Sequence, residues 1–209
     1  MVRAISSATS ELRVAVLEGD AIAAAIGEVA RLRIGVFRDW PYLYDGTLDY
    51  ETKYLAAFAR AKDAVVVAAY DAGIIVGAAT AAPLAGHTSE FVPLFADAGI
   101  DPDRVFYCGE SVLLAQYRGH GLGHAFFDHR EAKARRSTGA KGRYTHTAFC
   151  GVIRDSGDPR APTGYRPLDG FWRKRGYLPV PGLFGSYSWR EIGAAHESEK
   201  AMQFWMRPL

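Results

Sequence analysis

Three glycines stand within five residues, at Gly119, Gly121 and Gly123, between an apolar segment and an amphipathic one. Glycine lets a backbone approach a ligand closely and adopt conformations that other residues avoid. The N–H groups in the first turn of a helix lack partners within that helix and carry partial positive charge. A glycine turn from a strand into a helix therefore predicts an anion site suited to a pyrophosphate, and Arg118 adds a cation beside it.

The spacing of these glycines separates the turn from two common phosphate motifs. It is Gly-x-Gly-x-Gly, and no acidic residue ends a strand about 20 residues later, as a dinucleotide fingerprint requires. No Gly-Lys-Ser/Thr follows, so the segment is not a Walker A loop. A plain tight turn is the structural alternative, and the position between strand and helix favours a binding site.

The elements that position this turn follow from the apolar periodicity of the chain. Residues 104–114 predict a long strand, and residues 121–136 predict a helix with one apolar face. Asp20 and Asp49 are expected to cap two earlier helices. The remaining elements are expected strands at 12–17, 64–70, 73–82, 144–153, 187–192 and 202–206, and a short helix from Pro167 to Gly176. This order predicts one mixed α/β domain covering residues 1–209.

Two segments resemble the GCN5-related N-acetyltransferase (GNAT) family. Residues 118–123, Arg-Gly-His-Gly-Leu-Gly, resemble the family signature Gln/Arg-x-x-Gly-x-Gly/Ala. Residues 171–177, Phe-Trp-Arg-Lys-Arg-Gly-Tyr, are similar to the end of the family's last helix. The resemblance covers residues 12–209 as architecture and only these two stretches as motifs. It implies a splayed sheet of about seven strands flanked by about four helices.

The resemblance also implies acetyl-CoA as co-substrate, lying between strands 104–114 and 144–153. Backbone amides near Leu113 would then bind the pantetheine and polarise the thioester carbonyl. The implied pyrophosphate contacts are Arg118, Gly119, His120, Gly121, Leu122, Gly123 and His124. Trp172 would touch the cofactor while packing in the core. It stands where the family usually has a tyrosine that acts as the general acid, and an indole N–H is too weak an acid for that role.

Direct transfer to an amine requires a base for the ammonium and stabilisation of the charge that develops on the carbonyl oxygen. Glu110 is the expected base, since it lies in an apolar strand where desolvation raises the pKa of a carboxyl group. Its position also matches an acidic residue of the resembled family. The alternative is a Glu that is exposed or paired with an arginine. Tyr165 is the expected general acid if its loop folds inward, and water is the alternative.

Two further groups of residues have open interpretations. Trp40, Tyr42 and Tyr44 can line a pocket for a cationic acceptor through cation–π contacts, or simply pack. Several cations between Arg130 and Arg143 predict a solvated helix end, with contact to the 3′-phosphate of CoA as the alternative.

Cysteines and histidines point to no further chemistry. Cys108 and Cys150 are the two cysteines, and they form no disulfide framework. Neither has an evident His–Asp pair beside it, so burial is favoured over a nucleophile. His120 and His124 have metal-compatible spacing, but no third ligand accompanies them, and no metal is expected.

The composition limits the partners and the location. A net charge of +2 gives no reason to expect nucleic acid or membrane partners. The N-terminal segment lacks a signal-peptide core, and no apolar run reaches the roughly 20 residues of a membrane span. We therefore expect a cytoplasmic protein. A homodimer is compatible with the resemblance alone.

Together these features predict an acyltransferase that moves an acetyl group from acetyl-CoA to a primary amine of a small molecule or protein. Trp172 motivates one alternative, a non-catalytic acyl-CoA-binding regulatory module. A generic phosphate- or nucleotide-binding α/β protein is the other.

Overall fold

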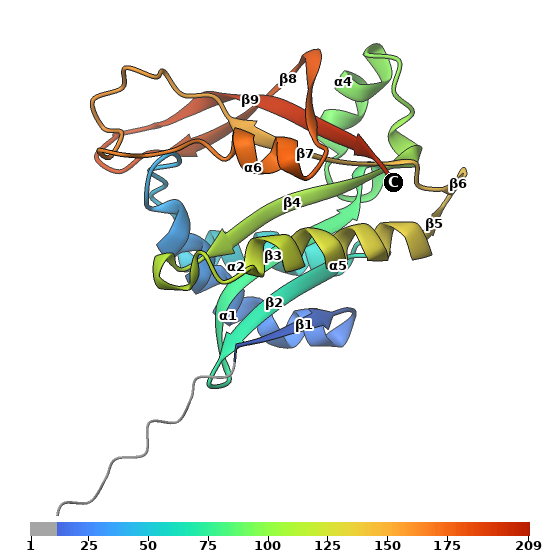
Figure 1. Cartoon of the computed structure of the whole chain (residues 1–209), viewed down its shortest axis with the longest axis horizontal. Helices are drawn as coiled ribbons and strands as arrows, with labels where there is room; N and C mark the ends of the chain where they lie inside the picture. The colour runs from blue at the N-terminus through green and yellow to red at the C-terminus, as the bar shows by residue number, and fades with distance from the viewer. Residues whose placement is uncertain (1–11) are drawn as a thin grey trace, which may run out of the picture.

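The computed structural model describes residues 12–209, which form a seven-stranded mixed sheet in the order β1-β2-β3-β4-β7-β9-β8 (Figure 1). The sheet strands are β1 (Arg13–Leu17), β2 (Val65–Asp71), β3 (Ile74–Pro83), β4 (Val105–Leu113), β7 (His146–Val152), β8 (Leu178–Arg190) and β9 (Glu197–Pro208). The helices are α1 (Asp20–Phe37), α2 (Leu48–Ala59), α3 (Leu84–His87), α4 (Val92–Asp97), α5 (Leu122–Arg136) and α6 (Asp169–Lys174). The predicted mixed α/β class is confirmed.

Helices cover both faces of the N-terminal half of the sheet. In β2, Val66 and Ala68 pack with α1 and α2, whereas Val67 and Ala69 pack with Leu122 and other residues of the α5 side. This alternation places α1 and α2 behind the sheet and α5 in front of it in Figure 1. Both faces of the strand are therefore buried, which explains its continuous apolar sequence.

The sheet splays between its two central strands. β4 and β7 are parallel and pair only from Val105 to Tyr107 and from His146 to Ala148. Beyond these residues β4 continues with β3 alone, and β7 continues with β9 alone. The facing edges of β4 and β7 therefore diverge, as the resemblance implied.

A bulge interrupts β4 at the start of this divergence. Ala81 pairs with Cys108 and Ala79 with Ser111, so a step of two residues in β3 is matched by three in β4. A Cβ atom at Gly109 would lie 2.7 Å from Oγ1 of Thr80, so only glycine fits there. The bulge sets the position of the neighbouring Glu110.

Both predicted helix caps are wrong by one or two residues. Gly19 is the N-cap of α1, and Asp20 is the first helical residue. Thr47 caps α2, where its Oγ1 accepts a hydrogen bond from the N–H of Tyr50 at 3.4 Å. Asp49 instead pairs with Lys53 on the helix surface at 2.8 Å. Acidic residues in the first turn still suit the helix dipole.

The C-terminal hairpin is longer than the sequence predicted. β8 spans 13 residues and β9 spans 12. The polar stretch from Glu197 to Lys200, expected to be a loop, pairs with the end of β8 at the sheet edge. This stretch contains only hydrophilic residues, so it lacks the alternation of apolar and polar side chains that predicts a strand. The small hairpin of β5 (Thr138–Gly139) and β6 (Gly142–Arg143) was also not predicted.

Two other segments differ in detail. The segment from Pro83 to Asp103, whose turn residues and single apolar stretch predict a loop with one small helix, contains α3, α4 and two short 3-10 turns. The helix expected from Pro167 is reduced to the six residues of α6. Within residues 12–209, none of the helices combines the length and apolarity that a membrane crossing requires.

Candidate functional site

The glycine turn leads from the end of β4 into α5, as predicted. Gly119 and Gly121 have φ angles of 84° and 78°, and a Cβ atom on either would meet no other atom within 4 Å. Their requirement for glycine is therefore conformational, and the space beside them is open. The first i→i−4 hydrogen bond of α5 runs from the N–H of Ala125 to the carbonyl of Gly121 at 3.1 Å. The preceding N–H groups of Leu122 to His124 thus lack that helical bond and are free to bind an anion.

Side chains of the two histidines support the turn without filling it. Nδ1 of His120 lies 3.2 Å from the carbonyl oxygen of Tyr117 and 3.1 Å from that of Arg118, so its N–H donates to the turn. The ring of His124 meets Phe171 edge-on at 5.0 Å. Residues 12–209 contain no group of three metal-ligating side chains. The contacts that the structure shows for these two histidines are therefore structural ones.

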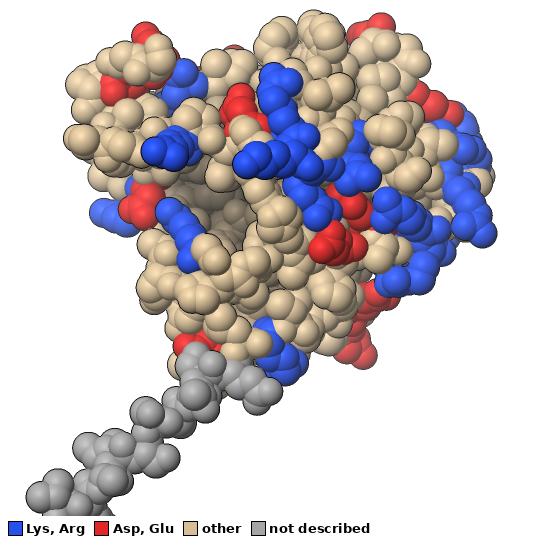
Figure 2. Space-filling view, in the orientation of Figure 1, with Lys and Arg blue, Asp and Glu red and all other residues tan. Residues whose placement is uncertain are grey.

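An opening adjoins this turn where β4 and β7 diverge. Peptide groups on the inner edge of β4, up to Leu113, have no partner on β7. Such groups form hydrogen bonds to a ligand or to water. Figure 2 shows a hollow on this face. In Figure 1, which has the same orientation, α6 and the end of β4 border this region.

Trp172 of α6 packs on β7 and β9. Its ring lies 4.9 Å from Phe149 and 5.1 Å from Trp205. A Cβ atom at Gly151 of β7 would come within 2.9 Å of the Trp172 ring, so the indole lies directly on the strand. Core packing of this side chain agrees with the sequence interpretation.

Glu110 lies in a buried ion pair. Its side chain is 6% exposed, and its Oε1 is 2.6 Å from Nη1 of Arg33 in α1. Arg33 also contacts Oε2 of the fully buried Glu51 at 2.5 Å. Pairing with an arginine was the alternative that the sequence left open, and Glu110 does not lie among apolar side chains alone.

This cluster of Arg33, Glu51 and Glu110 carries a net negative charge. Burial alone would lower the pKa of the Arg33 guanidinium, but the charges of Glu110 and Glu51 raise it above its usual value. Arg33 also lies over the ring of Tyr54, with 4.8 Å from Cζ to the ring centre. One permanent cation thus holds two carboxylates, and the surplus charge suits a cationic ligand.

Tyrosines surround the cluster. Burial raises the pKa of Tyr42, and the charges of Cys150, Tyr165 and Glu110 act on it. The Tyr107 hydroxyl and Cys150 Sγ, on β4 and β7, are hydrogen-bonded at 3.0 Å. Burial raises the pKa of the Cys150 thiol to about 12, so it stays protonated at neutral pH. Cys108 is fully buried. Both facts disfavour a cysteine nucleophile.

The three predicted acceptor aromatics take different positions. The ring of Tyr42 packs on Phe37 with 4.6 Å between the ring centres. Burial raises the pKa of the Tyr42 phenol, and the negative charge of Glu110 contributes to the rise. Burial raises the pKa of the Tyr44 phenol, and the nearby charge of Glu51 raises it further. The ring of Trp40 lies beneath the guanidinium of Arg154 at 5.4 Å. Tyr42 is therefore the one whose surroundings include Glu110.

Tyr165, the expected general acid, lies in the loop before α6. Its ring meets Trp40 edge-on at 6.1 Å, and 38% of the residue is exposed. Partial burial raises the pKa of its phenol. Tyr165 and Trp40, which are far apart in the sequence, thus lie side by side.

The basic run was interpreted incorrectly at its first member. Arg130 is 1% exposed and lies inside the fold, whereas Arg135 and Arg136 are exposed. Lys133 pairs with Glu18 at 2.9 Å. Sequence reasoning therefore missed that Arg33, Glu51 and Arg130 are buried charged residues. The sequence signal for each of them was a charged residue at a position where the helical repeat predicts an apolar one.

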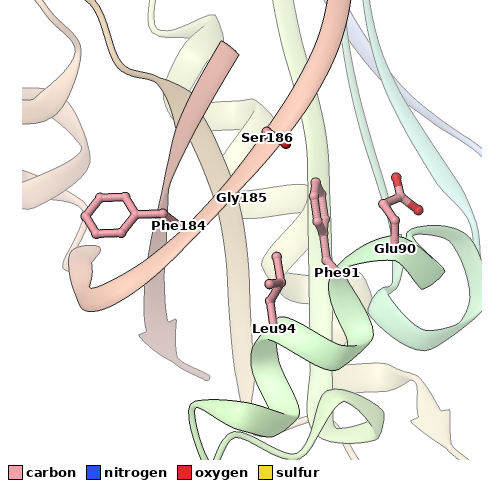
Figure 3. Close-up of a pocket in the computed structure, with 6 residues that line it drawn as sticks. All are labelled: Glu90, Phe91, Leu94, Phe184, Gly185 and Ser186. Carbon is pink, nitrogen blue, oxygen red and sulfur yellow. The ribbon is translucent and has the colours of Figure 1, made fainter. Parts of the chain in front are cut away.

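A second cavity lies between α4 and β8, with a volume of about 450 Å³ (Figure 3). Phe91 at its floor packs on Tyr187 at a ring distance of 4.9 Å. It is lined by Glu90, Phe91, Leu94, Phe184, Gly185 and Ser186. None of these belongs to the glycine turn, so the cavity is separate from the anion site.

Comparison with known proteins supports the architecture. No protein-family model and no curated protein matches this chain. A solved structure from Acinetobacter baylyi ADP1, provisionally assigned as an acetyltransferase, has a TM-score of 0.62 at 12% identity, covering 97% of this chain and 94% of that one. A GCN5-related N-acetyltransferase from Kribbella flavida has a TM-score of 0.53 at 16% identity, covering 95% and 98%. The chain has the GNAT fold.

Another GNAT-fold neighbour was solved with its ligand. The Arabidopsis thaliana protein NAA60, in complex with acetyl-CoA, has a TM-score of 0.58 at 11% identity, covering 95% of this chain and 99% of that one. At such low identities the GNAT fold is established, and the chemistry rests on the residues of this chain.

Proposed function

We propose that this protein transfers an acetyl group from acetyl-CoA to a primary amine of a small molecule or protein. The observation that carries the proposal is the continuity of two features of β4. Its inner edge diverges from β7, and its end runs into the open glycine turn at the N-terminus of α5. A strand edge for a pantetheine chain thus adjoins an anion site for a diphosphate.

The chain's groups fit acetyl-CoA in a defined order. The N–H groups of the turn from Arg118 to His124 would bind the diphosphate, and the Arg118 side chain would add a cation. Amides near Leu113 would donate to the pantetheine and to the thioester carbonyl. Trp172 would form the wall beside it. Bound acetyl-CoA would supply the activated acyl group.

The buried cluster would supply the general base, and Tyr165 would supply the general acid. Glu110 would accept the proton of the ammonium, directly or through a water, because its ion pair with Arg33 fixes its position at the bulge. Tyr165 would donate a proton to the departing thiolate. The Tyr165 hydroxyl would thus take the general-acid role, for which the indole N–H of Trp172 is too weak an acid.

The acceptor side suits a cationic amine. Glu51, Glu110 and Arg33 together carry one surplus negative charge, and Trp40, Tyr42 and Tyr44 would line the path of the amine. Aromatic faces and carboxylates both attract ammonium groups. The acceptor is therefore expected to enter positively charged and to lose its proton beside Glu110.

A pair of matched variants tests the cofactor site. In Gly121→Asp a carboxylate would stand beside the diphosphate, while Asp tolerates a positive φ and a helix N-terminus. Gly73→Asp is the control, since Gly73 has a φ of 85° and equally open surroundings in the turn between β2 and β3. We expect at least about tenfold weaker acetyl-CoA binding in Gly121→Asp only, measured by calorimetry.

Two measurements on the wild-type protein decide the activity. Millimolar acetyl-CoA should raise the melting temperature, because a ligand far above its Kd stabilises the folded state. An amine library should then release free thiol from acetyl-CoA. A larger thermal shift with ATP, or none with acetyl-CoA, would contradict the proposal.

One observation favours a second candidate, a non-catalytic acyl-CoA-binding regulatory module. Trp172 is packed between Phe149 and Trp205, where a tyrosine acid would be needed. Acetyl-CoA binding without thiol release from any amine would support this candidate over the enzyme.

A further inference from the structure

Arg130 is a buried cation held by main-chain carbonyls. It is 1% exposed and extends from α5 towards the sheet. Its Nε donates to the carbonyl of Phe126 at 3.2 Å. Its Nη1 donates to the carbonyls of Thr80 at 3.3 Å and Glu110 at 3.1 Å. The adjacent Glu131 binds Arg175 and Arg207 instead, so these carbonyls are the partners of Arg130.

Two of the three carbonyls that Arg130 binds, those of Thr80 and Glu110, belong to the bulge. The paired residues of β3 in the β3–β4 ladder pass from Ala79 to Ala81. Neither Thr80 nor Glu110 therefore has a paired residue across this ladder, although Thr80 pairs with Val66 of β2 on its other side. Buried carbonyls without a partner are costly, so a bulge needs donors from elsewhere. The guanidinium supplies them on one side. On the other, the N–H of Glu110 donates to Oγ1 of Thr80 at 3.3 Å.

Glu110 is consequently fixed at both ends. Arg130 holds its carbonyl from α5, and Arg33 holds its carboxylate from α1. The two helices lie on opposite faces of the sheet, so the residue is held across the whole layer (Figure 1). A small change in the bulge would move the carboxylate, and such misplacement of a catalytic group reduces catalysis strongly.

We propose that Arg130 is a positioning residue that sets the bulge of β4 and thereby directs Glu110 into the opening. This inference rests on the proposed function, because it assigns Arg130 a role in acyl transfer. Arginine suits the role, since its planar guanidinium donates from Nε and Nη1 in a fixed geometry, which the flexible ammonium of lysine does not reproduce.

The test compares Arg130→Met and Arg130→Lys with the wild type. Methionine retains an apolar stem and removes the donors, and lysine retains the charge. Arg135→Met is the control, on the same helix and exposed. We expect Arg130→Met to lower kcat at least about tenfold with the KM for acetyl-CoA changed less than about threefold, and Arg130→Lys to recover part of the loss. The control should match the wild type.

Hydrogen–deuterium exchange provides a readout that does not depend on turnover. We expect faster exchange in Arg130→Met to be confined to peptides covering residues 74–83 and 105–113, while acetyl-CoA affinity stays near that of the wild type. Uniformly faster exchange in all strands would show a general stabilising role and overturn the proposal. Wild-type kcat in a folded Arg130→Met protein would overturn it equally.

A second variant covers the case in which Arg130→Met does not fold. Thr80→Val removes the hydroxyl that accepts from Glu110 N–H and leaves Arg130 in place. It should reproduce both the loss of kcat and the local exchange, and wild-type values of both would reject the inference. If the wild-type protein binds acetyl-CoA without turnover, the proposed function fails, while unchanged exchange at the bulge in these variants would separately reject the role of Arg130.

Discussion

Arg33 and Glu110 join α1 to β4 through a buried ion pair with 2.6 Å between Nη1 and Oε1. Glu51 of α2 completes the cluster at 2.5 Å from Nε of the same guanidinium. A buried cluster of this kind depends on every member, because removing one partner leaves an uncompensated charge away from water. The helices that cover the acceptor side are thereby coupled to the proposed base.

Arg33→Met should destabilise the protein by about 3–5 kcal/mol, since it leaves two buried carboxylates without a cation. Urea denaturation measures the loss. Arg31→Met, on the exposed side of α1, is the control. Adding Glu51→Gln to Arg33→Met should recover part of the stability, because one of the two uncompensated charges is gone. Strictly additive losses in the double variant would show that the two residues are not coupled.

Glu110→Gln should lower turnover by about 100-fold or more, the range expected for loss of a general base. The amide keeps the shape of the side chain, so acetyl-CoA affinity should remain that of the wild type. Thiol-release kinetics and calorimetry give the two quantities. Parallel loss of binding and turnover would instead indicate a collapsed site.

Glu131→Gln is the matched counterpart of Glu110→Gln, a second buried carboxylate outside the proposed site. Glu131 accepts hydrogen bonds from Arg175 at 3.1 Å and Tyr177 at 3.2 Å, and it pairs with Arg207 at 3.2 Å. Its loss should lower the melting temperature and leave kcat unchanged in the folded protein. A fall in kcat below the melting transition would be evidence against this separation of roles.

The elements that carry the site follow closely from sequence. Gly119 and Gly121 adopt positive φ angles between a strand and a helix, as their spacing predicted. The apolar runs of β2 and β3 marked two strands because both faces of each are buried. The sequence was sufficient for these elements because each depends on a local requirement. The turn needs glycine at positive φ angles, and strands buried on both faces need apolar residues.

The charged core of the site did not follow from sequence. Arg33 continues the apolar repeat of Ile22, Ile26 and Val29, and Arg130 lies one turn after Phe126, yet neither position reveals its partners. The pairing of Arg33 with Glu110 depends on tertiary contacts between residues 77 positions apart. The bulge that directs Glu110 arises from a register shift between two strands, which neither strand encodes alone.

Alkaline pH should destabilise the protein through its buried phenols and thiol. Burial raises the pKa of Tyr107 well above its usual value and that of Cys150 to about 12. Their folded-state pKa values exceed the unfolded ones of about 10 and 8.5, so this stability is complete below pH 8.5 and is lost as pH rises. Urea unfolding between about pH 8 and 11 should show the decline.

Tyrosine absorbance at 295 nm provides the check on that decline. The buried phenols should ionise together with unfolding. Tyr107→Phe should weaken the pH dependence, and Tyr50→Phe, at a residue 58% exposed, should not. Gradual ionisation of every tyrosine in a protein that remains folded would contradict the assignment.

Tyr165→Phe tests the proposed general acid. Removing the hydroxyl should lower turnover about tenfold and alter the alkaline side of the pH–rate profile, because a phenol that donates its proton must be protonated to act. Tyr42→Phe is the informative comparison, since its hydroxyl lies in the field of both Glu110 and Tyr165. Loss of turnover in Tyr42→Phe with none in Tyr165→Phe would transfer the role to Tyr42. Full activity in both variants would leave water as the proton donor.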